Sequence, residues 1–271
     1  MADSTVSTGP AAGFGGKVRS PSALVARLVA GAIILCAWEI VVRTSAPAFV
    51  AKPSMILIAI PRVLVDPAFL AAAGATLAGV VEGLAIALVG GTIIGLAIGR
   101  SSLIDRTLRL YVNVFYAMPM LVVVPLFALW FGYTGAARLV TVIFASVFSI
   151  IVNVADGARA VPQEYVEVAR SFRSAPLRTL FDVVLPAATP YLLAGLRLAA
   201  GRALIGAVVA EFITAVSGIG YFILYNSRTY HENEAFVGVL VLAAFGVGFE
   251  SLVGWCTRRF LPWYRRELRG A

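Results

Sequence analysis

Long, uninterrupted runs of apolar residues recur along the chain and set its expected architecture. Each run is about as long as the roughly 20 residues that an α-helix needs to cross a bilayer. The six runs cover residues 24–43, 74–98, 108–131, 137–154, 190–214 and 235–255. Because they are continuously apolar and do not alternate with polar residues, they predict helices and not barrel strands. The pattern therefore predicts an all-α membrane protein with about six transmembrane helices.

The composition agrees with this prediction and divides the chain into three parts. Of the 271 residues, 60% are apolar and 13% are charged, which is more apolar surface than a soluble domain can bury. Residues 1–20 are rich in Gly, Ser, Thr and Ala and predict a disordered cytoplasmic tail. Residues 21–257 form the expected transmembrane domain, and residues 258–271 form a basic cytoplasmic tail.

The distribution of positive charge predicts the orientation of the chain. A net charge of +8 would suggest nucleic acid in a soluble protein, but here most lysines and arginines lie between the apolar runs. With the N-terminus in the cytoplasm, most of these cations fall on the cytoplasmic side, as the positive-inside rule requires. Both termini and the loop 155–189 are then cytoplasmic, and we expect membrane lipid, not nucleic acid, beside the basic tail.

That loop carries charge and still has helical periodicity. Its residues 161–186 read VPQEYVEVARSFRSAPLRTLFDVVLP. One helix face consists of Tyr165, Val168, Ala169 and Phe172, and the opposite face carries Glu164, Glu167 and Arg170. Pro176 interrupts this helix, and a second apolar repeat follows until Pro186 is expected to stop it. The spacing predicts two short helices at a bend, and by itself it fits a helix lying in the headgroups equally well.

The same loop resembles a known motif. Glu167, Ala169, Val183, Leu185 and Pro186 stand at the separations of the cytoplasmic EAA loop of ABC importer permeases of the binding-protein-dependent type. The resemblance implies the type I ABC importer permease fold and a coupling helix seated in a cleft of the ATP-binding subunit. The coupling residues it implies are Glu164, Glu167, Ala169, Arg170, Arg173, Leu185 and Pro186. Arg173 stands where the family usually has glycine.

The resemblance also implies the partners and the cellular location. Two cytoplasmic ABC ATPase subunits would bind ATP and Mg²⁺, and a second permease copy would complete the pathway as a homodimer. An extracytoplasmic binding protein would deliver the substrate to the bacterial inner membrane. The stretches that begin at Met118 and Pro190 resemble the nitrate, sulfonate and taurine branch, so we expect a small anionic or organic solute. The chain itself is expected to hold no cofactor and to have no enzymatic activity.

Small residues recur every four positions in the second apolar run. The strip consists of Gly79, Gly83, Ala87, Gly91, Gly95 and Gly99. Such a strip lets another helix approach closely, with Gly83, Gly91 and Gly95 at its centre. The partner helix belongs either to the same chain or to a second copy.

Charges and prolines inside the apolar runs mark further candidate positions. The charged candidates are Glu82, Arg197, Arg202, Glu211 and Glu250. Because intramembrane charges are costly, they either form static pairs, Arg202 with Glu82 and Arg197 with Glu250, or line the substrate path. Pro119 and Pro125 each remove a backbone hydrogen bond and predict a kink or break in the third run.

Two other classes of membrane protein compete with an importer permease. A self-sufficient secondary transporter often carries inverted repeats, but no clear internal repeat is found and the EAA-like loop would have no purpose. A membrane-embedded enzyme needs a cluster of histidines or carboxylates, and the sequence offers neither a catalytic nor a metal-ligand spacing. The sequence does not identify the transported substrate.

Overall fold

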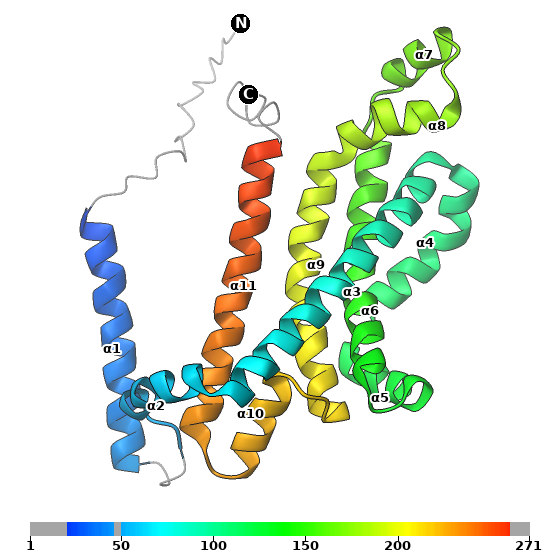
Figure 1. Cartoon of the computed structure of the whole chain (residues 1–271). Helices are drawn as coiled ribbons and strands as arrows, with labels where there is room; N and C mark the ends of the chain where they lie inside the picture. Colours follow the sequence, from blue (N-terminus) through cyan, green and yellow to red (C-terminus); the bar gives the residue numbers. More distant parts are fainter. Residues whose placement is uncertain (1–20, 46–49, 261–271) are drawn as a thin grey trace, which may run out of the picture. The chain divides into compact units, whose positions relative to one another are not determined.

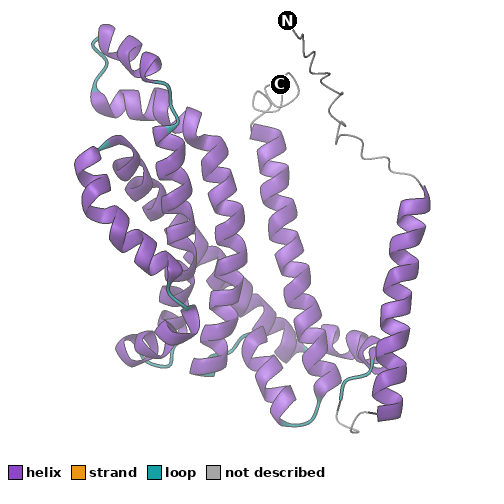
Figure 2. Ribbon diagram, turned by 180° about the vertical axis from the view of Figure 1, so that it is seen from behind, coloured by secondary structure: helices purple, strands orange, loops and turns teal. Residues whose placement is uncertain are grey.

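The computed structural model describes residues 21–45 and 50–260, and every regular element in these ranges is a helix (Figure 2). The chain divides into two compact units, residues 1–54 and 55–271. The expected tail at residues 1–20 and the part of the basic tail beyond residue 260 lie outside the described residues.

The first unit contains one long apolar helix, α1 (Pro21–Ser45). Near its end, the Glu39 carboxylate pairs with Arg43 and accepts hydrogen bonds from the backbone N–H and the hydroxyl of Ser54, at 3.0 and 2.7 Å. These bonds fix the chain just after the start of the next helix.

The second unit contains the remaining helices (Figure 1). They are α2 (Pro53–Val65, entering from the first unit), α3 (Pro67–Arg100), α4 (Ser102–Ala117), α5 (Met120–Phe131), α6 (Gly135–Arg159), α7 (Gln163–Ser171), α8 (Pro176–Thr179), a π-helical turn (Leu180–Val184), α9 (Leu185–Thr214), α10 (Ile219–Arg228) and α11 (Glu232–Phe260). Among the described residues of both units, five helical stretches are long and apolar enough to cross a membrane, and the pair α4 and α5 can count as a sixth. The six expected runs are therefore all found in helices.

Capping residues in the sequence set several of these helix starts. Asp66 precedes α3, and its carboxylate accepts a hydrogen bond from the backbone N–H of Ala68. Ser101 caps α4 through Ile104 in the same way. Such bonds satisfy backbone donors that have no partner within the helix.

The core of the second unit is formed by α3, α6 and α9, with α6 in contact with both others. The glycine strip of α3 faces α6 of the same chain. A Cβ atom at Gly83 would lie 2.5 Å from Val142, and one at Gly99 would lie 2.6 Å from Ala158. Helix α9 approaches α6 equally closely, because a Cβ atom at Gly206 would lie 2.9 Å from Ala145. The small residues of α3 therefore serve packing within one chain.

The third apolar run is not one straight helix, as a single span over residues 108–131 would require. Helices α4 and α5 are bent by 100° relative to each other, at a break that contains Met118 and Pro119. Pro119 lacks a backbone N–H and becomes the cap of α5, whereas Pro125 lies inside α5 without interrupting it. Of the two prolines, only the first produces a break.

Pro186 does not stop the helix, and this prediction is wrong. Helix α8, the π-helical turn and α9 follow one another directly, and Pro186 lies in the first turn of α9. The Leu185 N–H donates to the Leu180 carbonyl, five residues back instead of four. A proline ring normally meets the carbonyl four residues back, which here belongs to Asp182 inside the widened turn. The turn thus lets the helix continue past the proline.

Candidate functional site

Helix α7 protrudes beyond the neighbouring ends of α6 and α9 (Figure 1). Val166 is its one buried residue, and this side chain joins a cluster that includes Val161, Val184 and Leu96. The helix is therefore attached to the bundle mainly through a single apolar side chain. We call this end of the bundle the α7 end, and the opposite end, which carries α10, the α10 end.

The expected apolar face of α7 does not pack on its own chain. Tyr165 is 60% exposed, Val168 is 56% exposed and Phe172 is 83% exposed. The face that packs contains Val166, so the periodicity identified an apolar face but not the one that faces inward. We call Tyr165, Val168 and Phe172 the α7 apolar face. Glu164, Glu167 and Arg170 are exposed as well, so both faces are available to a partner.

The end of α7 shows why Arg173 is unusual. The Ser174 N–H donates to the Ala169 carbonyl at 3.0 Å, and the Arg173 N–H donates to the Arg170 carbonyl at 2.8 Å. This is the Schellman arrangement, in which the residue after the cap adopts the left-handed conformation. Arg173 does so, with a φ of 55°, although glycine is the residue that adopts it without a Cβ penalty. The turn therefore forms with arginine, at a cost in local stability.

Replacing Arg173 by glycine should stabilise the end of α7 by about 1 kcal/mol, because the left-handed penalty disappears. We expect amide hydrogen exchange in α7 to become about fivefold slower. Arg170→Gly is the matched control, since it removes an arginine from the helical last turn and should accelerate exchange. Equal or faster exchange in Arg173→Gly would show that the turn is not strained.

The remaining expected coupling residues lie at the same end. Leu185 is half-buried and packs on the cluster that holds Val166, and Pro186 follows it in α9. Arg170 and Arg100 line a cavity of about 330 Å³ between the loop and the end of α3. The structure thus brings the residues of the EAA-like loop together, next to the point where α9 begins.

A group of ion pairs at the α7 end was not expected from the sequence. Asp105 in α4 pairs with Arg159 in α6, and Arg159 also pairs with Asp156 at 3.0 Å. Arg109 lies 3.6 Å from the same Asp105 carboxylate. The pair of Asp105 with Arg159 holds the start of α4 against the end of α6, and the separation of these two residues in sequence gave no signal of the contact. The other two pairs lie within one helix each.

The α10 end is closed around Glu211, which is completely buried. Its carboxylate accepts hydrogen bonds from the Thr76 hydroxyl at 2.8 Å, the Gly220 N–H at 2.8 Å and the Arg138 guanidinium at 3.2 Å. Arg138 also donates to the Ser217 carbonyl at 2.9 Å. We call these residues the Glu211 cluster. It joins α3, α6, α9 and the start of α10. Arg138 is the ion-pair partner of Glu211, which the sequence did not identify.

The two expected charge pairs are not formed among the described residues. Glu82 and Glu250 are exposed and take part in none of the ion pairs found in residues 21–45 and 50–260. Arg197 is exposed beside Gly254 of α11. Arg202 instead lies over the ring of Tyr116, with its guanidinium carbon 4.0 Å from the ring centre. A cation–π contact of this kind has no fixed spacing that the sequence could reveal.

These features define a class of protein. In residues 55–260, helices long enough to cross a membrane pack with a core of α3, α6 and α9, and a helical loop protrudes at one end, so the class is that of multi-pass α-helical membrane proteins. The fold matches a crystal structure of an amino acid ABC transporter with a TM-score of 0.57 at 20% identity, covering 78% of this chain and 99% of that one. At this identity the match supports the fold alone.

Sequence comparison establishes the family. Residues 87–266 match the binding-protein-dependent transport system inner membrane component, and the chain belongs to this family. A nitrate import permease of Leptolyngbya laminosa is 31% identical over 69% of this chain and 67% of its own length. An aliphatic sulfonates transport permease of Bacillus subtilis is 33% identical over 64% of this chain, and the match spans 63% of that protein. The chain is therefore a multi-pass membrane protein of a non-enzymatic transport family.

Proposed function

We propose that this chain is the membrane-spanning permease of an ATP-driven importer for a small anion of the sulfonate or nitrate type. The names of the similar permeases and the membership of the family support the solute class. A separate ATPase binds ATP and Mg²⁺ and contacts the α7 end. Both termini and this end then lie in the cytoplasm of a bacterium, and a binding protein delivers the solute to the α10 end.

The observation that carries the coupling proposal is the exposed α7 apolar face. Three large apolar side chains stand on a helix that one buried residue attaches to the bundle. Fully burying a side chain such as Phe172 is worth about 1.5–3 kcal/mol. An amphipathic helix that presents its apolar face in this way fits a groove in a partner protein. The partner that the family implies is the ATPase subunit.

The connection between α7 and α9 suggests how a movement of the ATPase reaches the bundle. Helix α8, the π-helical turn and α9 follow without a break, so a displacement of the loop is transmitted to α9. Helix α9 carries Arg202 near its middle and Glu211 near its far end. Two copies of the chain would enclose the path, and the solute would be exposed first at the α10 end and then at the α7 end.

The coupling proposal predicts that Phe172→Asp weakens the complex with the ATPase. Losing this apolar anchor and burying a charge should cost at least about 2 kcal/mol, which is roughly a 30-fold loss of affinity. Tyr133→Asp is the matched control, because Tyr133 is also aromatic and 65% exposed but lies between α5 and α6, away from α7. The measurements are co-purification of the ATPase and solute uptake in reconstituted vesicles.

The charged face of α7 is tested in the same assay. Glu167→Lys reverses a charge at the proposed contact and leaves the apolar face intact, so uptake and stimulation of ATP hydrolysis should fall at normal expression. A helix resting in lipid headgroups predicts no loss, because an added lysine is favourable at an anionic surface. Wild-type coupling in both Phe172→Asp and Glu167→Lys would remove the proposed role of α7.

A further inference from the structure

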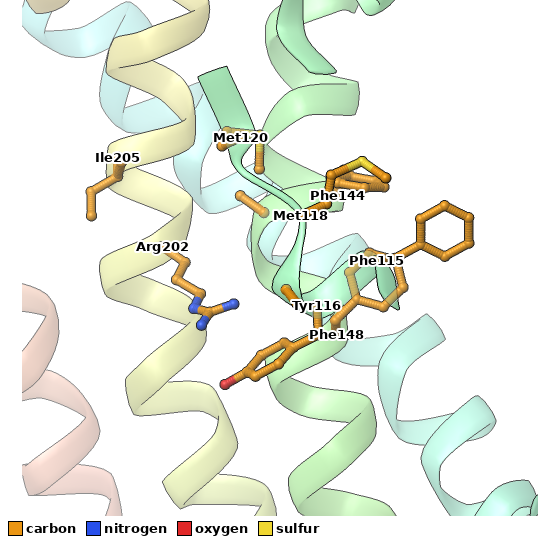
Figure 3. A pocket seen from close by; sticks show the side chains of 10 residues that line it. Phe115, Tyr116, Met118, Met120, Phe144, Phe148, Arg202 and Ile205 are labelled. Atoms are coloured by element: carbon orange, nitrogen blue, oxygen red, sulfur yellow. The ribbon is translucent and has the colours of Figure 1, made fainter. Parts of the chain in front are cut away.

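A cavity of about 270 Å³ lies where the break between α4 and α5 faces α6 and α9 (Figure 3). Its walls come from the end of α4, the break itself, the middle of α6 and the middle of α9. The lining residues are Phe115, Tyr116, Ala117, Met118, Met120, Phe144, Ala145, Phe148, Arg202 and Ile205. The volume is smaller than the roughly 300–1,000 Å³ of sites for drug-sized ligands, so it fits a solute of few atoms.

Arg202 is the one charged residue in this lining. Its side chain extends from α9 toward the Tyr116 ring, as Figure 3 shows. Among the residues that the structure describes, no carboxylate pairs with it and no acceptor takes a hydrogen bond from it. The contact with the ring fixes the cation without using its five N–H donors as hydrogen bonds to the protein. The cavity therefore presents an unneutralised positive charge with free donors.

The depth of the cavity in the membrane excludes a lipid headgroup as the anion that binds Arg202. Arg202 stands near the middle of the membrane-spanning helix α9, far from both of its ends. The phosphate of a lipid headgroup lies at the membrane surface, so it does not reach this depth. An arginine fork matches the oxygens of an oxyanion, and the surrounding rings of Phe115, Phe144 and Phe148 can contact an apolar tail.

We propose that this cavity is an anion-binding site on the transport path, where Arg202, held by Tyr116, binds the oxygens of a small monovalent oxyanion. The proposal rests on the proposed function, which it deepens by placing the solute within the chain. The interrupted helix pair makes the site possible, because the break around Met118 opens a space that a straight span would fill. A site of this kind selects against cations through the same fixed charge.

The test measures binding of ethanesulfonate to the purified permease–ATPase complex by saturation-transfer difference NMR. In the wild type we expect a signal that nitrate displaces and choline, a cation, does not. Arg202→Gln should weaken ethanesulfonate binding at least about tenfold, because charge-assisted hydrogen bonds are lost. Arg228→Gln, which removes an arginine from the last turn of α10, should bind as the wild type does.

A second pair of variants tests the site without changing Arg202, so the result does not depend on whether Arg202→Gln folds. Met118 lines the cavity and is 37% exposed, so Met118→Glu places a carboxylate beside Arg202 without filling a packed core. It should neutralise the cavity and abolish anion binding, whereas Met118→Gln, of the same size but uncharged, should retain it. Wild-type affinity in Met118→Glu, or in folded Arg202→Gln, would overturn the site, as would a wild type without signal at millimolar ethanesulfonate.

The outcome also separates this site from the importer assignment. If the permease does not associate with an ATPase, the proposed function fails whatever the anion signal shows. If the complex forms and transports while anion binding and uptake ignore Arg202, the importer assignment stands and the site alone is wrong.

Discussion

Replacing Glu211 by alanine should lower the stability of the protein more than the loss of any exposed charge in the membrane helices. The substitution removes the acceptor of three hydrogen bonds and leaves the Arg138 guanidinium, whose side chain is 13% exposed, without its carboxylate. Breaking a buried ion pair from one side costs about 3–5 kcal/mol. For a chain of this size we expect the midpoint of thermal unfolding to fall by on the order of 10 °C.

Two further variants show whether the loss comes from the Glu211 cluster. Glu250→Ala removes a carboxylate that is exposed on α11, so it should leave the unfolding midpoint nearly unchanged. Glu211→Ala combined with Arg138→Ala should cost less than the sum of the two single changes, because neither charge is then left alone. Strictly additive losses would show that Glu211 and Arg138 do not interact in the folded protein.

The Glu211 cluster links elements that would have to move together or separate if the α10 end opens during transport. Its bonds join three helices of the core to the start of α10. If the bundle opens at this end, these elements either move together or separate at the cluster. Solute transport by Glu211→Ala should therefore be measured as well as its stability. If the cluster holds the permease shut, removing it should let solute leak in the absence of ATP.

The sequence predicted the helices well because the bilayer imposes their length. Five of the six apolar runs each lie in one helix and the third is divided between α4 and α5, since a membrane segment must satisfy its backbone hydrogen bonds internally. The resemblance of residues 161–186 to the EAA loop indicated the family, and the family match confirms it. Fold class and family could therefore be read from local patterns.

The errors arose where distant parts of the chain decide the outcome. Glu211 and Arg138 are 73 residues apart, and nothing in either neighbourhood identifies the other as its partner. Val166 faces the bundle, and the division of α7 into an apolar and a charged face did not predict this orientation, because the cluster beneath the helix sets it. The exception is local: Pro186 does not stop its helix because a π-helical turn directly precedes it. Periodicity reports which residues share a face, but not what covers that face.

Replacing Gly95 by leucine should reduce the yield of folded protein severalfold. A Cβ atom at this position would lie 2.8 Å from the Val154 Cβ and 2.9 Å from the backbone oxygen of Ile151, so α3 and α6 must move apart. Overpacking usually costs about 1–3 kcal/mol. Here the cost should lie at the upper end, because a carbonyl cannot rotate away and separated membrane helices lose packing without hydrophobic compensation. The measurement is the monodisperse fraction in size-exclusion chromatography of the solubilised protein.

Gly90→Leu is the matched control, because it lies on the same helix and a Cβ atom there meets nothing within 4 Å. Its yield should equal that of the wild type, and an equal yield for Gly95→Leu would show that α3 and α6 are not packed as described.

A second experiment compares an obstruction by a side chain with an obstruction by the backbone. At Gly83, the atoms nearest to an added Cβ belong to the Val142 side chain. Val142→Ala removes the Cγ1 atom at 2.5 Å but keeps the Cβ atom at 2.8 Å, so it should rescue Gly83→Ala in part. Val154→Ala should rescue Gly95→Ala hardly at all, because the Val154 Cβ at 2.8 Å and the Ile151 oxygen at 2.9 Å both remain in place.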